Sequence, residues 1–251
     1  MPNPPSKPLS AVAEAGLLLL ASGAEVARVE DTMTRLGRAF GLEVEAMVLP
    51  TMVLATAEND MVMRRVRTRR TNLAVLELVN QWSREAAAGA LSLEELLRRL
   101  PGARTTHRYP AWYEAAAAGV AAAALALLFG GTWATLPWAF AAGVMAQGIR
   151  LAFKARSQVG ILGDMAAASG TVLPALAAAQ LPGAHPALVL VGGIMVLVPG
   201  VLLTTGVRDG MAGDLLSSLA RLLEAALISA AVAGGASLVL FIYVHLGGRW
   251  P

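Results

Sequence analysis

From Ala111 onward the chain consists of long apolar runs separated by short connections, and this pattern constrains its fold more than any other feature. A helix needs about 20 apolar residues to cross a bilayer. Five runs approach or exceed that length, at residues 112–129, 133–153, 159–180, 187–207 and 219–246. The sequence therefore predicts a polytopic α-helical membrane protein, with about five transmembrane helices in residues 111–251.

Charge separates the first 110 residues from the rest. They carry 14 of the 20 Lys and Arg residues and 12 of the 17 Asp and Glu residues. Because this charge is nearly balanced, it argues against nucleic-acid binding, and we expect the net charge of +3 to reflect basic residues kept on the cytoplasmic side. The absence of cysteine excludes disulfides, thiolate chemistry and Cys-based metal sites.

The polar residues 1–110 predict a small α+β domain. Residues 23–40 have an apolar stripe at helical spacing, after a shorter helix around residues 12–20. Residues 43–48, 52–57 and 61–67 read as strands, with a turn at residues 58–60. Helices follow from residue 71 or 72 to about residue 88 and from Ser92 to Pro101, so the coarse order is αβββαα. The start MPNPPSKPLS has no apolar signal core, and we expect this domain in the cytoplasm.

A dense basic cluster begins within the third predicted strand and continues beyond it: Arg64, Arg65, Arg67, Arg69 and Arg70. It could be a solvated strand edge near an anionic membrane face. The alternative is a cytoplasmic vestibule that concentrates an anionic substrate. The sequence leaves both open.

Basic residues in the connections predict the orientation of the membrane half. The connections 130–132 and 181–186 contain no Lys or Arg. By contrast, Lys154 and Arg156, with Arg150 close by, flank the second connection, and Arg208 flanks the fourth. The positive-inside rule then places the N-terminal domain in the cytoplasm and the C-terminus outside.

Pro199 and Gly200 interrupt the fourth apolar run. Proline removes a helix hydrogen bond, and the freed carbonyls are tolerated only against protein or a water-filled cavity, as in the discontinuous helices of transporters. Thr204 and Thr205 follow one turn later and could add hydroxyl ligands. A packed kink without a binding role is the alternative.

Ionisable residues supply the other candidates. Asp164, within the third run, is the most plausible proton-carrying or substrate-binding acid there, or else a hydrated helix cap. Arg208, Asp209 and Asp214 form a polar cytoplasmic turn before the last run. Arg221 and Glu224 are three residues apart and can pair with each other, which weakens their case as substrate ligands.

Three segments resemble the threonine/serine exporter family: SGAEVARVEDTMTRLGRAFGLEVE (22–45), RVRTRRTNLAVLELVN (65–80) and LVPGVLLTTGVRDGMAGDLLSSLARLLEA (197–225). The last is the most specific, through its ordered Pro-Gly, Arg-Asp and Gly-Asp elements. The resemblance implies a cytoplasmic N-terminal domain and export of a small amino acid or carboxylate. Single-chain members carry about twice as many spans, so the chain resembles the larger subunit of the split form, which is linked to succinate export. It implies a smaller partner with about five further spans, in the inverted-repeat arrangement.

The leading hypothesis is thus a subunit of a secondary exporter in the inner membrane, not an enzyme. Its pathway would include Asp164, Pro199, Gly200, Thr204, Thr205, Arg208, Asp209 and Asp214. We expect no catalytic residue, metal or cofactor; a higher oligomer stays open. The alternatives are a membrane-anchored enzyme or ligand-sensing domain, for which Glu25, Glu30 and Asp31 supply carboxylates, and a purely structural assembly subunit.

Overall fold

The computed structural model describes residues 6–67, 71–103, 109–156 and 160–250. It divides into two compact units, which are described separately. Unit 1 comprises Met1–Arg108 together with Gly200–Leu223, and unit 2 comprises Tyr109–Pro199 together with Glu224–Pro251. Residues 200–223, which the sequence groups with the membrane half, thus cluster with the N-terminal residues.

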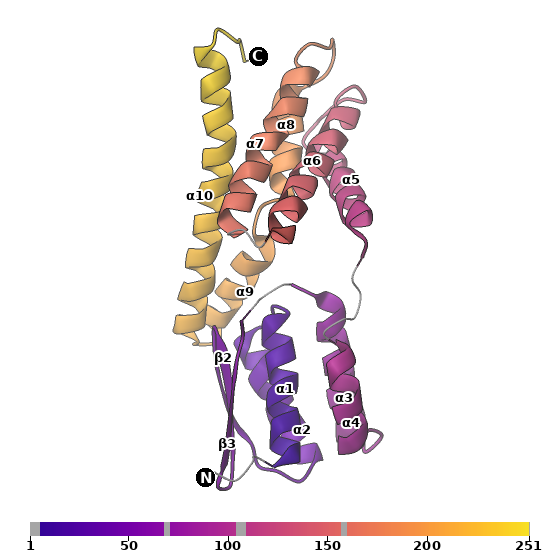
Figure 1. The fold of residues 1–251 in the computed structure, drawn as a ribbon, viewed down its shortest axis with the longest axis vertical. Helices are drawn as coiled ribbons and strands as arrows, with labels where there is room; N and C mark the ends of the chain where they lie inside the picture. Colours follow the sequence, from indigo (N-terminus) through magenta and orange to yellow (C-terminus); the bar gives the residue numbers. More distant parts are fainter. Residues whose placement is uncertain (1–5, 68–70, 104–108, 157–159, 251) are drawn as a thin grey trace. The chain divides into compact units, whose positions relative to one another are not determined.

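Unit 1 contains a three-stranded sheet and helices packed on it (Figure 1). Its elements are α1 (Lys7–Ala21), α2 (Val26–Ala39), β1 (Glu45–Leu49), β2 (Met52–Ala57), β3 (Asp60–Arg65), α3 (Leu73–Ala87) and α4 (Leu93–Ala103). The strands are antiparallel in the order β1-β2-β3. The predicted strands and helices are present, and α1 and α2 are separate helices, so the order is ααβββαα.

Local sequence explains the element boundaries. Gly41 follows α2 with a φ of 76°, and Glu58 turns the chain between β2 and β3 with a φ of 53°. Asn72 caps α3 by accepting from the Val75 N–H at 3.3 Å. The prediction that the last helix closes at Pro101 is wrong, because α4 continues through it to Ala103.

The core of unit 1 lies between the sheet and the helices. α1 is apolar around most of its circumference and buries Val12 and Leu19. Met33 of α2 and Val53 of the sheet belong to the same buried core. Glu30 on α2 accepts from the Val48 N–H of β1 at 3.1 Å. These contacts place α1 and α2 on one face of the sheet.

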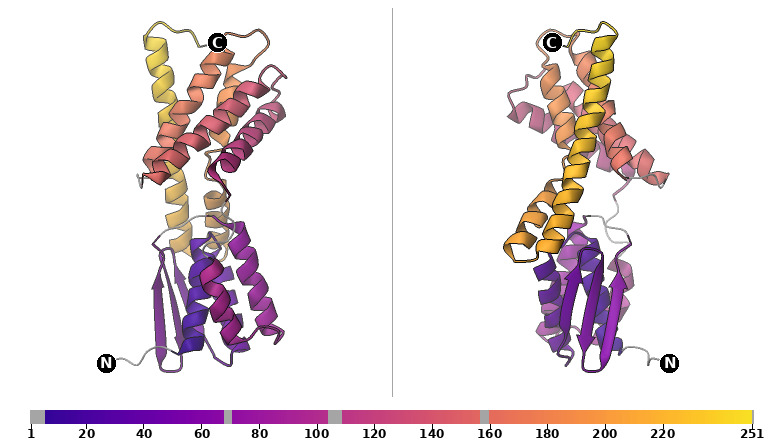
Figure 2. Two further views of the ribbon diagram at one scale, coloured as in Figure 1. Left: turned by 45° about the vertical axis from the view of Figure 1, so that its right-hand side comes forward. Right: turned by 90° about the vertical axis from the view of Figure 1, so that its left-hand side faces the viewer.

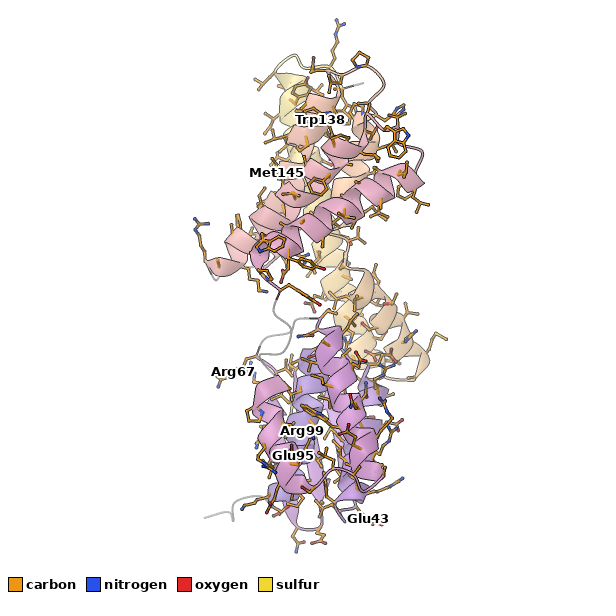
Figure 3. All side chains as sticks on the ribbon, turned by 90° about the vertical axis from the view of Figure 1, so that its right-hand side faces the viewer. Glu43, Arg67, Glu95, Arg99, Trp138 and Met145 are labelled. Carbon is orange, nitrogen blue, oxygen red and sulfur yellow. The ribbon has the colours of Figure 1, made fainter. Side chains whose placement is uncertain are left out.

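Ion pairs join the remaining parts of unit 1. Arg99 on α4 pairs with Glu95 at 2.9 Å and with Glu85 of α3 at 3.1 Å, and Figure 3 labels Arg99 and Glu95. In the predicted basic cluster, Arg64 donates to Ser10 Oγ of α1 at 3.0 Å. β3 is an edge strand. Arg69 and Arg70 lie outside the described residues.

Unit 2 is helical. It contains α5 (Ala111–Leu128), α6 (Leu136–Ala155), α7 (Gly160–Ala178) and α8 (Pro186–Met195). α9 (Gly200–Met211) belongs to unit 1, and α10 (Leu215–His245) begins in unit 1 and continues into unit 2. By length and apolar composition α5, α7 and α10 could each cross a membrane, and the interrupted pair α8 and α9 could make a fourth span.

Small residues let the helices of unit 2 approach closely. A Cβ at Gly143 of α6 would overlap the carbonyl oxygen of Ala118 on α5, and one at Gly192 of α8 would overlap that of Ala122. Such contacts are typical of membrane helices, which associate through backbone packing. The small side chains of Ala118 and Ala122 thus let α6 and α8 lie against the backbone of α5.

Candidate functional site

The apolar run predicted as the fourth span is interrupted as its sequence suggests. α8 ends at Met195 and α9 begins at Gly200. Between them the Leu197 N–H donates to the Ile194 carbonyl at 2.8 Å, in a tight turn. Because Pro199 has no N–H, a continuous helix would lack a hydrogen bond at this point. Open space surrounds Gly200, where an added Cβ would meet no atom within 4 Å.

The two threonines of α9 bond to their own helix. Thr204 Oγ1 donates to the Gly200 carbonyl at 3.0 Å, and Thr205 Oγ1 donates to the Val201 carbonyl at 2.6 Å. Thr204 is exposed, whereas Thr205 is buried. Their hydroxyl oxygens can still accept a hydrogen bond.

α9 and the first turns of α10 form a tight hairpin. Gly213 turns the chain with a φ of 91°, and Asp214 caps α10 by accepting from the Ser217 N–H at 3.3 Å. A Cβ at Gly210 would lie only 2.8 Å from Ser218 Oγ. The small residues thus bring polar side chains of the two helices together.

The centre of this hairpin is a buried ion pair. Arg221 Nε of α10 lies 2.8 Å from Asp209 Oδ2 of α9, and the two side chains are 2% and 1% exposed. Neither atom makes a hydrogen bond of good geometry, so the contact is chiefly electrostatic. Arg221 also donates to Thr205 Oγ1 at 3.4 Å. Because burial of either charge alone would be costly, each group stabilises the charged form of the other.

The same pair binds the connection between α1 and α2. Arg221 donates to the Ala24 carbonyl at 2.6 Å, and Asp209 Oδ1 accepts from the Val26 N–H at 3.0 Å. Val26 is the first residue of α2, whose N-cap residue Glu25 makes no side-chain cap bond. Asp209 therefore serves as a cap supplied from another part of the sequence, where the helix dipole favours a negative charge.

A second ion pair lies beside the first at the surface. Arg208 donates to Glu25 Oε1 at 2.7 Å, with the Arg208 side chain 65% exposed. We call Glu25, Thr205, Arg208, Asp209 and Arg221 the Arg221 cluster. It combines one buried ion pair and one exposed ion pair across segments separated by some 180 residues of sequence.

Unit 2 contains a separate ion pair, in which the acid is buried and the base is exposed. Asp164 Oδ1 on α7 lies 2.8 Å from Arg150 Nε on α6, and Asp164 is 4% exposed. Close by in sequence, Gln147 of α6 donates to Glu114 of α5 at 3.3 Å, as expected for a polar residue that bonds to a neighbouring helix. The acid predicted within the third run thus has a basic partner, Arg150.

The structure gathers part of the predicted set. Thr205, Arg208 and Asp209 lie in the Arg221 cluster, and Asp214 caps the following helix. Thr204, Pro199 and Gly200 belong to the helix interruption and the turn after it, and Asp164 lies in the unit 2 pair.

Sequence reasoning missed three of the residues that make these contacts. The sequence predicts a pair between Arg221 and Glu224, names Glu25 only for the alternative of an enzyme or sensor, and uses Arg150 only to predict orientation. One signal could have singled out Arg221: no other Lys or Arg lies between Arg208 and Arg249.

The chemistry of these groups suits charge recognition more than bond-making. Guanidinium groups bind carboxylates through charge-assisted, often bidentate hydrogen bonds. Among the described residues, no three His, Asp or Glu side chains are grouped in a way that could hold a metal ion.

Comparison with known proteins identifies the family. The model of the family described as "Putative threonine/serine exporter" matches residues 10–243, which include both units. The chain belongs to this threonine/serine exporter family. The match includes every residue of the Arg221 cluster and the helix interruption.

Individual relatives agree with the family assignment. A "Probable threonine/serine exporter" of Mycobacterium tuberculosis is 29% identical over 227 residues, which cover 87% of this chain and 43% of that protein. The chain therefore spans less than half the length of this relative. "Probable succinate transporter subunit YjjP" of Escherichia coli and of Klebsiella aerogenes are each 28% identical over 240 residues, covering 92% of both chains. No solved structure matches.

Proposed function

We propose that this chain is one subunit of a secondary transporter that exports a small carboxylate, such as succinate, or a small amino acid, such as threonine or serine, across the inner membrane. One observation carries the proposal: the chain covers 92% of two proteins named as probable succinate transporter subunits but only 43% of a protein named as a probable threonine/serine exporter. The second half of the transporter would come from a smaller membrane partner. That partner would supply about five spans of inverted orientation.

The proposed topology has five spans. They are α5, α6, α7, the interrupted pair α8 and α9, and the part of α10 after Glu224. That part is free of charged side chains up to His245, and its roughly 20 residues suffice to cross the hydrocarbon core. The first turns of α10, which carry Arg221, would then lie on the cytoplasmic side with the N-terminal domain.

The proposed pathway uses the helix interruption and the groups that follow it. The carbonyls that Pro199 leaves without an N–H donor support a site there. Arg208, 65% exposed, suits the attraction of an anionic substrate at the cytoplasmic entrance, and Thr204 offers a hydroxyl on the same helix. Asp164 with Arg150, and Asp209 with Arg221, are the candidates for proton coupling or gating. Asp214 orders the turn between α9 and α10.

The test is efflux from proteoliposomes under an imposed pH gradient. Liposomes loaded with labelled succinate or labelled threonine would contain the chain alone, the chain with its partner, or neither. We expect efflux only with both chains, and the labelled compound that leaves identifies the substrate class.

Two outcomes would redirect the proposal. Efflux by the chain alone would remove the need for a partner. No efflux of either compound from correctly folded and oriented protein would favour the membrane-anchored sensor or enzyme, which ligand binding or hydrolysis by the full chain would then test.

A further inference from the structure

The sheet of unit 1 has one face that its own helices do not cover. Its three cross-strand rows are Glu45, Thr56 and Met61; Met47, Leu54 and Met63; and Leu49, Met52 and Arg65. We call these nine residues the outer sheet face. The alternate residues, among them Val48, Val53 and Val62, point into the core beneath α1 and α2.

The outer sheet face is apolar and exposed. Met47, Met61 and Met63 are 57%, 67% and 60% exposed. In the right-hand view of Figure 2 the three strands lie in front of the helices α1 to α4. A contiguous apolar patch of this kind on a water-exposed domain marks an interaction site, and flexible methionines are favoured at such surfaces.

The charged residues of this face have opposite signs and lie at opposite corners. Glu45 ends the first row on β1, and Arg65 ends the third row on β3. A two-fold axis along the other diagonal, through Leu49, Leu54 and Met61, places Glu45 of one molecule against Arg65 of a second. The same operation places Met47 of one copy on Met52 of the other, and Met63 on Thr56. From the residue and strand spacings the strands would cross at roughly 70°, nearer to the orthogonal than to the aligned arrangement of packed sheets.

We propose that the outer sheet face binds the same face of a second copy of this chain. The face is self-complementary in charge, as an isologous interface requires. A membrane-binding face would instead carry basic residues around an apolar centre, and Glu45 does not suit an anionic lipid surface.

The size of the face determines where the dimer should be found. Three strands of five or six residues span roughly 10 Å by 17 Å, which is small for a stable interface. Two chains held in one membrane have a high effective concentration, which compensates for weak pairing. The dimer should therefore be tested in membranes.

Single-cysteine cross-linking provides the test, because the chain contains no cysteine. Leu54→Cys and Met61→Cys lie on the proposed axis, so each thiol should face its copy and form a disulfide-linked dimer on mild oxidation of membranes that contain the full chain. Glu77→Cys, on the exposed side of α3, is the matched control and should stay monomeric.

Charge exchange then tests the specific pairing. In the Leu54→Cys background, Glu45→Arg or Arg65→Glu should each lower the yield of linked dimer about tenfold, and the two together should restore it. The proposal would be overturned if no dimer formed at either axis position, or if the dimer were equally frequent at Glu77→Cys. It would also be overturned if the axis thiols cross-linked only to a different protein, or reacted only with lipid-soluble reagents.

Discussion

Removal of the Asp209 carboxylate should open the contact between the α1–α2 connection and the α9–α10 hairpin. In Asp209→Ala, Arg221 keeps its charge but loses its counter-ion while 2% exposed, and the Val26 N–H loses its acceptor. Breaking a buried ion pair costs about 3–5 kcal/mol. We expect about 3 kcal/mol, the low end of this range, because Arg221 retains hydrogen bonds to Thr205 and Ala24.

The amide of Val29, which donates to the Glu25 carbonyl in the first turn of α2, reports this opening in hydrogen exchange of the full-length protein. A loss of about 3 kcal/mol raises the population of the open state, and so the exchange rate, by roughly 100-fold. Glu25→Gln is the matched control: it weakens only the exposed pair with Arg208 and should raise exchange less than about fivefold. Asp209→Leu combined with Arg221→Met should recover most of the protection, because it removes both charges together.

The reasoning would be refuted by equal exchange in Asp209→Ala and Glu25→Gln. It would also be refuted if the free energy of opening lost in the double variant equalled the sum of the losses in the two single variants, since the two charges would then act independently.

Three further perturbations follow from the packing and the charges. Gly143→Ala should lower the thermal stability of the purified protein by several degrees, because its Cβ would overlap backbone of α5, whereas Gly148→Ala in the same helix meets open space and should be neutral or stabilising. Burial raises the pKa of Glu30 above its ordinary value of 4.5, so the free energy of unfolding should fall as the pH rises above that value. Glu30→Gln should flatten this part of the stability–pH profile, and an unchanged profile would show that Glu30 does not cause it. Arg150→Ala leaves Asp164 buried without its partner, so it should lower the melting temperature more than the double variant Arg150→Ala with Asp164→Ala does. A larger decrease in the double variant would show that the two residues do not stabilise each other.

Much of the fold followed from local patterns in the sequence. The spacing of Val26, Val29, Met33 and Leu36 predicts α2, and alternation in residues 43–48 predicts β1, because each pattern reflects burial of one face. Pro199 predicts the helix interruption because the missing N–H is a property of the residue itself. Helix ends were predicted less well, as at Pro101, because a single proline in the last turn removes only one bond.

The Arg221 cluster depends on contacts that no local pattern contains. The sequence offered Arg221 a partner three residues away, but the hairpin brings Asp209 from the preceding helix instead. Ala24 and Val26 contribute backbone groups, and any residue type would offer the same carbonyl or N–H. Pairing of Asp164 with Arg150 likewise needs the packing of α6 against α7, which periodicity alone does not specify.

The central claim, export along the interrupted helix, can be tested at Gly200, where open space accommodates a cysteine in a chain that has none. The measurement is efflux of labelled substrate from proteoliposomes containing Gly200→Cys and the partner, before and after complete reaction with a water-soluble maleimide, with Gly148→Cys as control. We predict that modification at position 200 abolishes efflux and that substrate slows the modification, while the control is unaffected. Undiminished efflux after full modification at position 200 would contradict the proposed pathway.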